Sequence, residues 1–582
     1  MEYVGAHQDE KAYYAMRDYV RNYGIKNFRR SPGLIWDLAR YSKQYGPPGE
    51  ALQLYKLAIK HYAEGTDTTL LFKEFDALNR DKLRYFVPME RYYQMVAARK
   101  EIDTLIAPRP SKMNMGAYVN SKKEDYAPSV GNNDNLILFS SKRNSHNAIP
   151  PRFDEDIFFT VHANGIWTKA KEFDINTSFN EGSVCISPDG KILIFSRCDA
   201  PGGLGNCDLY EARLQQDSTW GEIKNLGEAI NSAGWDSHPA LSHTGDTLFY
   251  ASNRADGFGM SDIYYSVRNR NGEWLYSRNA GPLINTRNSE VSPFFHHKDN
   301  VLYFSSDGQA INFGRFDIYK TRLVDWNWTE PRNLGPLVNG KGDDYYFAID
   351  SKSEILYFAR SSEYDLKNHD LHAFPVPMEA QPGALAKLYG TLKNLEGKPI
   401  HGIVSVFDLD KRTEVAPKYT REDGSFDFDL IDQRNYLLVV QGDEFFRIEE
   451  IFFLNGDLEM NEVTEPIDRK IEFKSIEFES GQSEILDKMK GDLAKVGQFL
   501  LDNPEMKMNI AGHTDSNGDP QFNIELSQTR ADAIKEYLVT KYNLDDTRIG
   551  TFGYGSRKPL VKEVTDKDRQ INRRVEFEIY RD

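Results

Sequence analysis

The segment Ile510-Ala-Gly-His-Thr-Asp-Ser-Asn-Gly518 joins the end of a strand to the start of a polar loop. Apolar residues alternate from Met506 to Ile510, as expected of a strand, and Asp515 and Gly518 suit the turn that follows. From Asn523 to Tyr542, apolar residues recur at helical spacing and define one inward stripe. The sequence therefore predicts a strand, a polar loop and an amphipathic helix, in this order.

Arg530 falls on the inward stripe of that helix, four residues after Leu526 and four before Ile534. A permanent charge on the packed side of a helix is costly unless an anion meets it. Asp515 is the nearest candidate in the chain. Two interpretations remain open: an internal salt bridge between Asp515 and Arg530 that only shapes the loop, or a pair that binds the ammonium and carboxylate of an amino acid.

A series of ordered motifs surrounds this pair: Gly-His-Thr-Asp (512–515), Asn-x-x-Leu-Ser-x-x-Arg-Ala (523–531), Gly-Tyr-Gly (553–555) and Asn-Arg-Arg-Val (572–575). They resemble the OmpA-like peptidoglycan-binding domain over about Glu472 to Asp582. Within this range we expect an opening strand at 476–481 and a helix from Ser483 to Asn503. One departure from the family pattern is the segment between Pro559 and Asn572, which carries no glycine.

The resemblance implies an α+β fold that binds meso-diaminopimelate in the stem peptide of peptidoglycan. Carried over by position, Asp515 would bind the ammonium of diaminopimelate and Arg530 would bind its carboxylate. The residues that would form the walls or support of the site are Thr514, Asn523, Leu526 and Arg574.

The composition of the whole chain limits the classes of function. At 582 residues the chain is too long for one core, and about three to five domains are expected. A hydrophobic content of 40% excludes a disordered chain. The net charge of −16 argues against binding to nucleic acid or to an anionic membrane surface. No run of about 18 apolar residues predicts a transmembrane helix.

The first ten residues carry neither a positive start nor an apolar core, so they are not a signal peptide. A cell-wall binder must be exported. We therefore expect a periplasmic protein associated with the outer membrane, whose leader, with or without a lipidated cysteine, is missing from this sequence. Cys198 and Cys207 flank a glycine-rich loop and could pair, but two buried free thiols are favoured.

Residues 1–110 are predicted to form an all-α domain. Trp36-Asp-Leu-Ala-Arg-Tyr, the break at Gly46-Pro-Pro-Gly and the small residues that follow resemble a tetratricopeptide repeat. Helices from Ala12 to Tyr23 and from Thr68 to Lys100 would complete the stack, because one repeat cannot bury its own face. Either a groove for a protein partner or a helical bundle that covers the next domain is consistent with this pattern.

Residues 111–378 repeat a pattern of about 54 residues five times. The repeated strands are Leu136-Ile-Leu-Phe-Ser, Ile192-Leu-Ile-Phe-Ser, Thr247-Leu-Phe-Tyr-Ala-Ser, Val301-Leu-Tyr-Phe-Ser and Ile355-Leu-Tyr-Phe-Ala. With the turn Ser187-Pro-Asp-Gly190, they resemble WD40-like, TolB-type propellers of five blades. Strand material from Ala117 to Val130 could close the ring with the last blade.

Several motifs inside the repeat suggest chemistry, but the repeat accounts for them. An aspartate begins each Asp-Ile-Tyr-like strand, at Asp156, Asp208, Asp262, Asp317 and Asp370, and is expected to fix a turn rather than hold a metal. The histidine pair His296-His297 has no Cys, Asp or Glu partner at the spacing of a metal site. No nucleophile elbow occurs. We therefore predict no catalytic residue, no metal and no cofactor.

Residues 379–383 have the composition of a linker. The strand patterns of residues 386–456 then resemble a carboxypeptidase regulatory-like domain, a small β-sandwich that serves as a spacer. The acidic stretch from Asn455 to Asp468 is predicted to be a second linker. The OmpA-like domain follows at 470–582.

The predicted domain order resembles the PorE-type proteins associated with the type IX secretion system. It favours a non-catalytic scaffold that binds the peptidoglycan stem peptide and holds envelope or secretion proteins through its helical and propeller domains. Two alternatives remain: an envelope sensor whose propeller binds a ligand, and a wall-acting enzyme. The enzyme needs a nucleophile or a carboxylate pair in one cleft, and the sequence provides neither.

Overall fold

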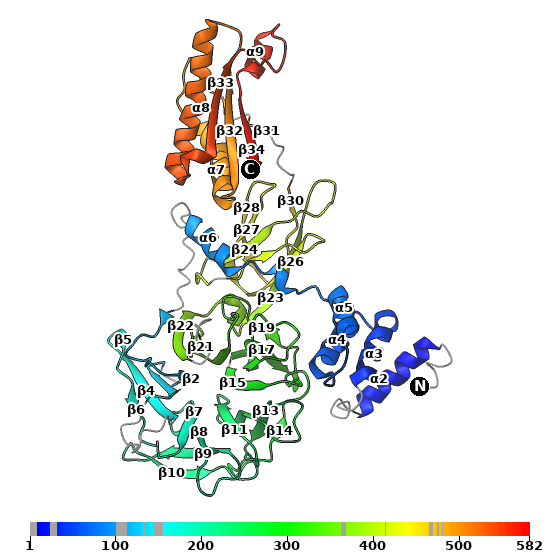
Figure 1. The fold of residues 1–582 in the computed structure, drawn as a ribbon, viewed down its shortest axis with the longest axis vertical. Helices are drawn as coiled ribbons and strands as arrows, with labels where there is room; N and C mark the ends of the chain where they lie inside the picture. Colours follow the sequence, from blue (N-terminus) through cyan, green and yellow to red (C-terminus); the bar gives the residue numbers. More distant parts are fainter. Residues whose placement is uncertain are drawn as a thin grey trace. The chain divides into compact units, whose positions relative to one another are not determined.

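The computed structural model of this protein describes residues 8–23, 32–99, 113–131, 134–143, 155–296, 298–361, 368–413, 415–464, 470–473, 476–479 and 481–581. The chain divides into two compact units (Figure 1). One unit comprises Met1–Leu83 and Arg109–Leu385, and the other comprises Arg84–Pro108 and Ala386–Asp582. The predicted helical region of residues 1–110 is thus divided between the two units.

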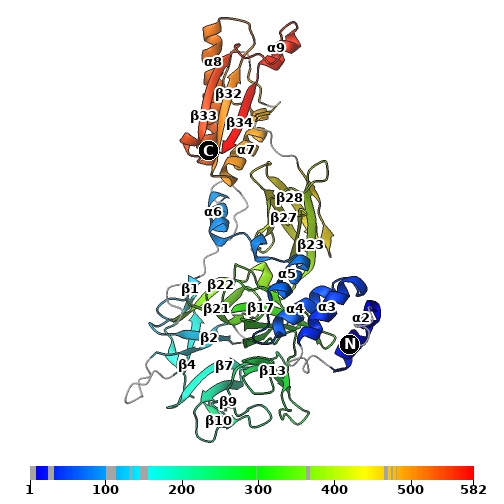
Figure 2. The same ribbon diagram turned by 45° about the vertical axis from the view of Figure 1, so that its right-hand side comes forward.

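Four helices begin the first unit: α2 (Asp9–Tyr23), α3 (Pro32–Tyr45), α4 (Glu50–His61) and α5 (Thr69–Leu78). Consecutive helices contact one another (Figure 2), and their core contains the buried Tyr13, Leu38, Tyr55 and Phe75. The helical segment predicted from Thr68 to Lys100 is divided after α5. The short helix η2 (Leu83–Tyr85) and helix α6 (Met89–Arg99) lie beyond this break, so α6 does not extend the stack.

Helix α4 packs on the β-rich part of the same unit through Lys60, which is fully buried. The Lys60 ammonium donates to the carbonyl oxygen of Leu283 at 2.8 Å and pairs with the Glu330 carboxylate at 2.8 Å. The backbone N–H of Arg287 donates to the Lys60 carbonyl at 2.8 Å. The helices and the β-rich part are therefore joined by a buried polar contact.

Five antiparallel sheets make up this β-rich part. Four are built from consecutive strands, and the fifth also includes β1. The first sheet contains β2 (Asp125–Val130), β3 (Leu136–Ser141), β4 (Asp156–Ala163), β5 (Ile166–Trp167) and β6 (Lys171–Glu172). The second contains β7 (Asn180–Ile186), β8 (Ile192–Cys198), β9 (Cys207–Leu214) and β10 (Trp220–Asn225). The third contains β11 (Asp236–Leu241), β12 (Thr247–Ser252), β13 (Asp262–Val267) and β14 (Arg278–Asn279).

The fourth sheet contains β15 (Glu290–His296), β16 (Val301–Ser306), β17 (Asp317–Val324), β18 (Asn327–Trp328) and β19 (Arg332–Asn333), with the short helix η3 (Lys298–Asn300) before β16. The fifth contains β20 (Asp344–Ile349), β21 (Ile355–Ser361), β22 (His369–Pro375) and β1 (Met113–Asn114). The first strands of consecutive sheets contact one another, and β2 also contacts β20. The strand that joins the last sheet is therefore β1 and not 117–130, since Asp125–Val130 opens the first sheet.

The repeated sequence motifs fall on the second and third strands of these sheets. The five predicted strands are β3, β8, β12, β16 and β21. Among the described residues, three of the five aspartates, Asp208, Asp262 and Asp317, hold the preceding turn as predicted. For example, the Asp208 carboxylate accepts hydrogen bonds from the backbone N–H groups of Leu204 and Gly205, and Asp262 accepts from that of Gly259.

Four of the five sheets contain a buried ion pair between the first strand and an arginine at the end of the second strand. The pairs are Asp125–Arg143, Glu181–Arg197, Asp236–Arg254 and Asp344–Arg360. In the fourth sheet the acidic residue is Glu290, which faces Ser306 in register just as Asp236 faces Ser252. Gly308 then stands two residues after Ser306, where the third sheet has Arg254. The fourth sheet thus keeps the buried acid without its arginine.

The expectation of two free thiols at Cys198 and Cys207 is wrong, because these residues form a disulfide. They are register partners at the ends of β8 and β9, and their Cα atoms lie 3.9 Å apart. The glycine-rich loop between them closes a hairpin that brings the sulfurs together. Cys185 is a free, buried cysteine.

The predicted linker at 379–383 is part of the packed structure and not a linker. The short helix η4 (Met378–Ala380) has fully buried side chains at Met378 and Ala380. The hydroxyl of Tyr303 donates to the Ala380 carbonyl at 2.7 Å, and the Lys320 ammonium donates to the Gln381 carbonyl at 2.9 Å. Residues 378–381 are therefore fixed to the fourth sheet.

Two further sheets follow along the chain. They are built from β23 (Ala384–Lys393), β24 (Ile403–Asp408), β25 (Lys418–Tyr419), β26 (Ser425–Ile431), β27 (Arg434–Gln441), β28 (Ile448–Leu454), β29 (Leu458–Glu459) and β30 (Glu462–Val463). The strands β29 and β30 both pair with β23 in parallel. This corrects the prediction of a linker at 455–468, since residues 458–463 belong to a sheet.

The C-terminal domain is a sheet in the order β31-β34-β32-β33 that is covered by helices. Its elements are β31 (Lys470–Glu472), α7 (Asp487–Asp502), β32 (Met506–His513), α8 (Pro520–Tyr542), η5 (Asp546–Arg548), β33 (Ile549–Gly555), α9 (Asp566–Asn572) and β34 (Val575–Arg581). The opening strand lies at 470–472 and not at 476–481. Residues 476–479 are irregular, and Ser480 lies outside the described residues.

Candidate functional site

Helix α8 approaches β32 and β33 closely because two glycines face it. A Cβ atom at Gly512 would lie 2.2 Å from the carbonyl oxygen of Ser527, and one at Gly553 would lie 2.5 Å from the backbone nitrogen of Gln528. The Ser527 hydroxyl also accepts a hydrogen bond from the Gly555 N–H at 2.9 Å. This close packing brings the loop after β32 next to the first turns of α8.

The loop after β32 is held by its own hydrogen bonds. The Asp515 carboxylate accepts from the Asn517 N–H at 3.1 Å, and the buried Asn523 amide donates to the carbonyl oxygens of Asp515 at 3.3 Å and Asn517 at 2.8 Å. The Thr514 hydroxyl donates to the Asp515 carbonyl at 3.0 Å. Asn523 and Thr514 therefore shape the loop from within.

The Asp515 carboxylate pairs with Arg573, whose guanidinium lies 2.6 Å away. Asp515 is largely buried, whereas the Arg573 side chain remains 38% exposed. Sequence reasoning assigned a role to Arg574 and missed Arg573. Arg574 instead hydrogen bonds to the Glu576 carboxylate at 2.8 Å through its Nε.

Arg530 is only 5% exposed, which confirms its predicted place on the inward stripe of α8. Its Nε donates to the Gln482 carbonyl and its Nη2 to the Glu479 carbonyl, each at 2.8 Å. The guanidinium carbon lies 5.1 Å from the centre of the Phe478 ring. Within the described part of the chain, no carboxylate lies within ion-pair distance of Arg530. The internal Asp515–Arg530 salt bridge is therefore not formed.

The electrostatics of Arg530 follow from this environment. Burial lowers the pKa of Arg530, the neighbouring Arg573 lowers it further, and Asp515 raises it. Two arginines thus share the field of a single aspartate. An additional anion at Arg530 would be stabilised by both arginines.

The segment that departs from the family pattern supports the loop through Glu563. Its carboxylate accepts from the Ser516 N–H at 3.1 Å, from the Ser516 hydroxyl at 2.5 Å and from the Asn572 amide at 2.9 Å. Burial raises the pKa of Glu563, but the hydrogen bonds from Ser516 and Asn572 outweigh it and lower the pKa. Sequence reasoning missed this contact, because Glu563 and Ser516 are far apart in the chain.

Comparison with known proteins identifies a family match for the C-terminal part of the chain. Residues 477–573 match the OmpA family. The C-terminal domain is OmpA-like. The predicted resemblance is therefore confirmed for this domain, and the rest of the chain lies outside the match.

The chain is 33% identical over 104 residues to outer membrane porin F of Pseudomonas aeruginosa. The matched region covers 18% of this chain and 30% of the porin. It is 35% identical over 100 residues to the peptidoglycan-associated lipoprotein of Buchnera aphidicola, covering 17% of this chain and 57% of that protein. The chain spans about a third of the length of the first curated relatives it matches. Among solved structures, a putative TolB from Agrobacterium tumefaciens is 14% identical over 44% of this chain and 85% of that chain, with a TM-score of 0.29.

The site in the OmpA-like domain combines groups of both charges. Asp515 offers a carboxylate beside the loop, Arg530 offers a buried guanidinium, and the half-buried Leu526 lies one helical turn before Arg530.

No helix of the described residues is long and apolar enough to cross a membrane. Across the same residues, no cluster of three or more His, Cys, Asp or Glu side chains could hold a metal ion.

Proposed function

We propose that this protein binds peptidoglycan through its OmpA-like domain and anchors an envelope complex to the cell wall. One observation carries the proposal. Arg530 is buried without a carboxylate partner among the described residues, next to the Asp515–Arg573 pair. A buried guanidinium is costly to leave unpaired, so a ligand carboxylate would stabilise it.

The free end of diaminopimelate has the matching chemistry, since it is an amino acid head group with one carboxylate and one ammonium. Arg530 would bind the carboxylate, and Asp515 would accept from the ammonium. Arg573 adds a second positive charge toward the carboxylate. Thr514 and Asn523 would hold the loop, Leu526 would offer an apolar wall, and Arg574 would support the site through Glu576.

We infer a periplasmic, outer-membrane-associated location and a non-catalytic role. The relatives that match the OmpA-like domain include an outer membrane porin and a peptidoglycan-associated lipoprotein, which supports this inference. The five sheets would be the blades of a WD40-like propeller, the helices α2–α5 tetratricopeptide-like, and β23–β30 a carboxypeptidase regulatory-like sandwich. These parts would hold envelope proteins, in the manner of the PorE-type scaffolds of type IX secretion.

A second candidate function is an envelope sensor whose β-rich part binds a ligand. It is favoured by a cavity between the five sheets. In a sensor, the OmpA-like domain would serve only to localise the protein.

Co-sedimentation with insoluble sacculi tests the wall-binding proposal. We expect the parent protein to sediment and Asp515→Ala and Arg530→Ala to lose at least tenfold in apparent affinity, because each variant leaves the opposite charge of the ligand unmatched. Arg548→Ala is a matched control. Arg548 is a half-buried arginine that donates to the carbonyls of Leu500, Asn503 and Met506, near the other end of β32.

The control separates loss of the site from loss of the fold. Arg548→Ala should lower the unfolding temperature of the domain and still sediment below that temperature. Unchanged sedimentation of both site variants would reject the site, as would a loss in Arg548→Ala equal to theirs while the domain stays folded.

A further inference from the structure

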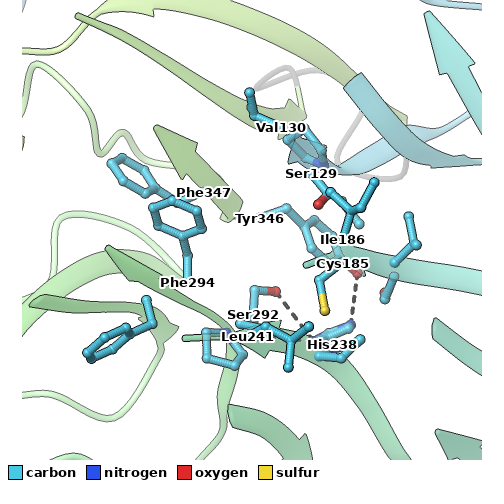
Figure 3. Close-up of a pocket in the computed structure, with 18 residues that line it drawn as sticks. Ser129, Val130, Cys185, Ile186, His238, Leu241, Ser292, Phe294, Tyr346 and Phe347 are labelled. Atoms are coloured by element: carbon cyan, nitrogen blue, oxygen red, sulfur yellow. Dashed lines mark hydrogen bonds between the residues drawn. The ribbon is translucent and has the colours of Figure 1, made fainter. Parts of the chain in front are cut away.

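The first strands of the five sheets surround a cavity of about 100 Å³. Residues from β2, β7, β11, β15 and β20 line it (Figure 3). All of them belong to the first unit, far in the chain from the OmpA-like domain. We call it the inter-sheet cavity.

Each first strand carries the same irregularity at this cavity. The pairing with the second strand shifts register through a bulge in every sheet. Inside each bulge one residue other than glycine has a positive φ: Ala127 (53°), Ser183 (46°), His238 (54°), Ser292 (52°) and Tyr346 (54°). All five line the cavity.

Such conformations are costly for residues with a side chain, at about 1–3 kcal/mol each. Glycine would remove this cost, yet no glycine stands at any of the five positions. Strain of this kind persists where the surrounding structure enforces it, and it is concentrated at ligand sites. Five equivalent strained residues around one cavity therefore point to binding.

Three of these residues form a polar floor. The Ser292 N–H donates to the Nδ1 of His238 at 3.2 Å, so Nδ1 is an acceptor and the proton lies on Nε2. Burial lowers the pKa of His238 to about 3, which keeps the imidazole neutral. His238 Nε2 lies 3.2 Å from the Tyr346 hydroxyl and donates to it. Among the described residues, no acceptor binds the Tyr346 hydroxyl hydrogen, which therefore remains available to a ligand.

Beside this polar floor, part of the cavity wall is apolar. This part includes Val130, Ile186, Leu241, Phe294 and Phe347, and Figure 3 shows these side chains around the His238–Tyr346 pair. No Asp, Glu, Lys or Arg is among the lining residues. A charged ligand would lose its hydration without gaining a counter-charge. The ligand must therefore be uncharged.

The size of the cavity limits the ligand further. An apolar cavity of about 150 Å³ holds a benzene molecule. The inter-sheet cavity is smaller, at about 100 Å³, and is partly open, so it admits no more than one small ring, part of which would lie at its mouth. We propose that the inter-sheet cavity binds a small neutral ring compound with one oxygen that accepts a hydrogen bond from Tyr346. This inference goes beyond wall binding and does not depend on it.

Phenol is the probe, and benzoate is its charged counterpart of similar size. With the full chain, saturation-transfer NMR should show phenol binding and at least tenfold weaker binding of benzoate. Tyr346→Phe should weaken phenol binding about fivefold, the effect of one hydrogen bond. Tyr345→Phe is the matched control, since Tyr345 is the adjacent residue in β20 and does not line the cavity.

Cys185 provides an independent measurement inside the cavity. It is the free thiol beside His238 in Figure 3, and burial raises its pKa to about 12. Its reaction with a neutral disulfide reagent should be slow, and saturating phenol should slow it at least threefold further. Cys185→Met, which fills part of the cavity, should abolish phenol binding.

The proposal fails if phenol does not bind, if benzoate binds as well as phenol, or if Tyr345→Phe weakens binding as much as Tyr346→Phe. Phenol that leaves the reactivity of Cys185 unchanged would place the bound phenol elsewhere and also overturn it. Asp515→Ala should retain full phenol binding, which keeps this test separate from the test of wall binding.

Discussion

At the scale of single residues, the sequence predicted the burial of Arg530 in the candidate site but not the partner of Asp515. The place of Arg530 on the inward stripe of α8 followed from helical spacing, and the structure buries it. The partner of Asp515 could not be predicted from the sequence, because Arg573 and Arg574 are both arginines and are adjacent in the chain. Successive residues beside a strand point to opposite sides. Only the register of β34 decides that Arg573 meets Asp515 while Arg574 meets Glu576.

Glu563 gives a residue-scale prediction about the shape of the site. Glu563→Gln removes the charge that accepts three hydrogen bonds from Ser516 and Asn572. The loop that presents Asp515 should loosen, and binding to sacculi should fall about two- to tenfold, less than in Asp515→Ala. Co-sedimentation across a protein titration measures this change.

The matched control is Glu525→Gln, since Glu525 is exposed on α8 and its carboxylate accepts from Gln521. This variant should bind as the parent does. If Glu563→Gln also binds as the parent does, Glu563 has no role in holding the loop.

At the scale of elements, the repeated second strands were predictable because they are nearly continuous apolar runs, and the third strands because each contains the same Asp-Ile-Tyr-like motif. The first strands were not, since their bulges interrupt the alternation of side chains that a strand pattern relies on. The strand expected at 476–481 fails for a related reason. Its apolar residues Ile476 and Phe478 pack on the core of the C-terminal domain, but they lie in an irregular segment. The short alternating pattern therefore indicated which side chains are buried and not that the segment pairs in a sheet.

The fourth sheet carries an element-scale prediction on pH. Burial of Glu290 raises its pKa to about 8 from an ordinary value of 4.5, and Asp262 adds to the increase. The folded protein therefore holds a proton that the unfolded chain releases between pH 4.5 and pH 8. In this window the contribution of Glu290 to the free energy of unfolding should fall with rising pH, by about 1.4 kcal/mol per pH unit.

Glu290→Gln should remove this slope, because glutamine does not titrate. Urea unfolding of the parent and the variant at pH 5, 6, 7 and 8 gives the two slopes. Glu273→Gln is the control, as Glu273 is exposed in the loop after β13. Equal slopes in the parent and in Glu290→Gln would show that Glu290 is ionised in the folded protein.

At the scale of the molecule, the sequence predicted the order of the folded parts but not which connecting segments are packed into them. Composition marked residues 379–383 and 455–468 as linkers, yet Ala380 is buried and residues 458–463 pair with β23. Polar and acidic residues on exposed turns of a sheet have the same composition as a linker. The contacts that distinguish the two come from distant residues such as Tyr303 and Lys320.

Lys60 tests how the helices α2–α5 are held on the five sheets. Burial lowers the pKa of Lys60, and the Glu330 carboxylate partly offsets this decrease. Lys60→Met removes the nearer of the two described lysines that pair with Glu330 and leaves only Lys56, so it should destabilise the contact, by up to about 3 kcal/mol. Hydrogen exchange of the α4 amides should rise, while exchange in the OmpA-like domain stays unchanged. Lys56→Met is the control, because Lys56 lies 3.9 Å from Glu330 and is more exposed. Equal exchange in both variants would mean that apolar packing alone holds the helices in place.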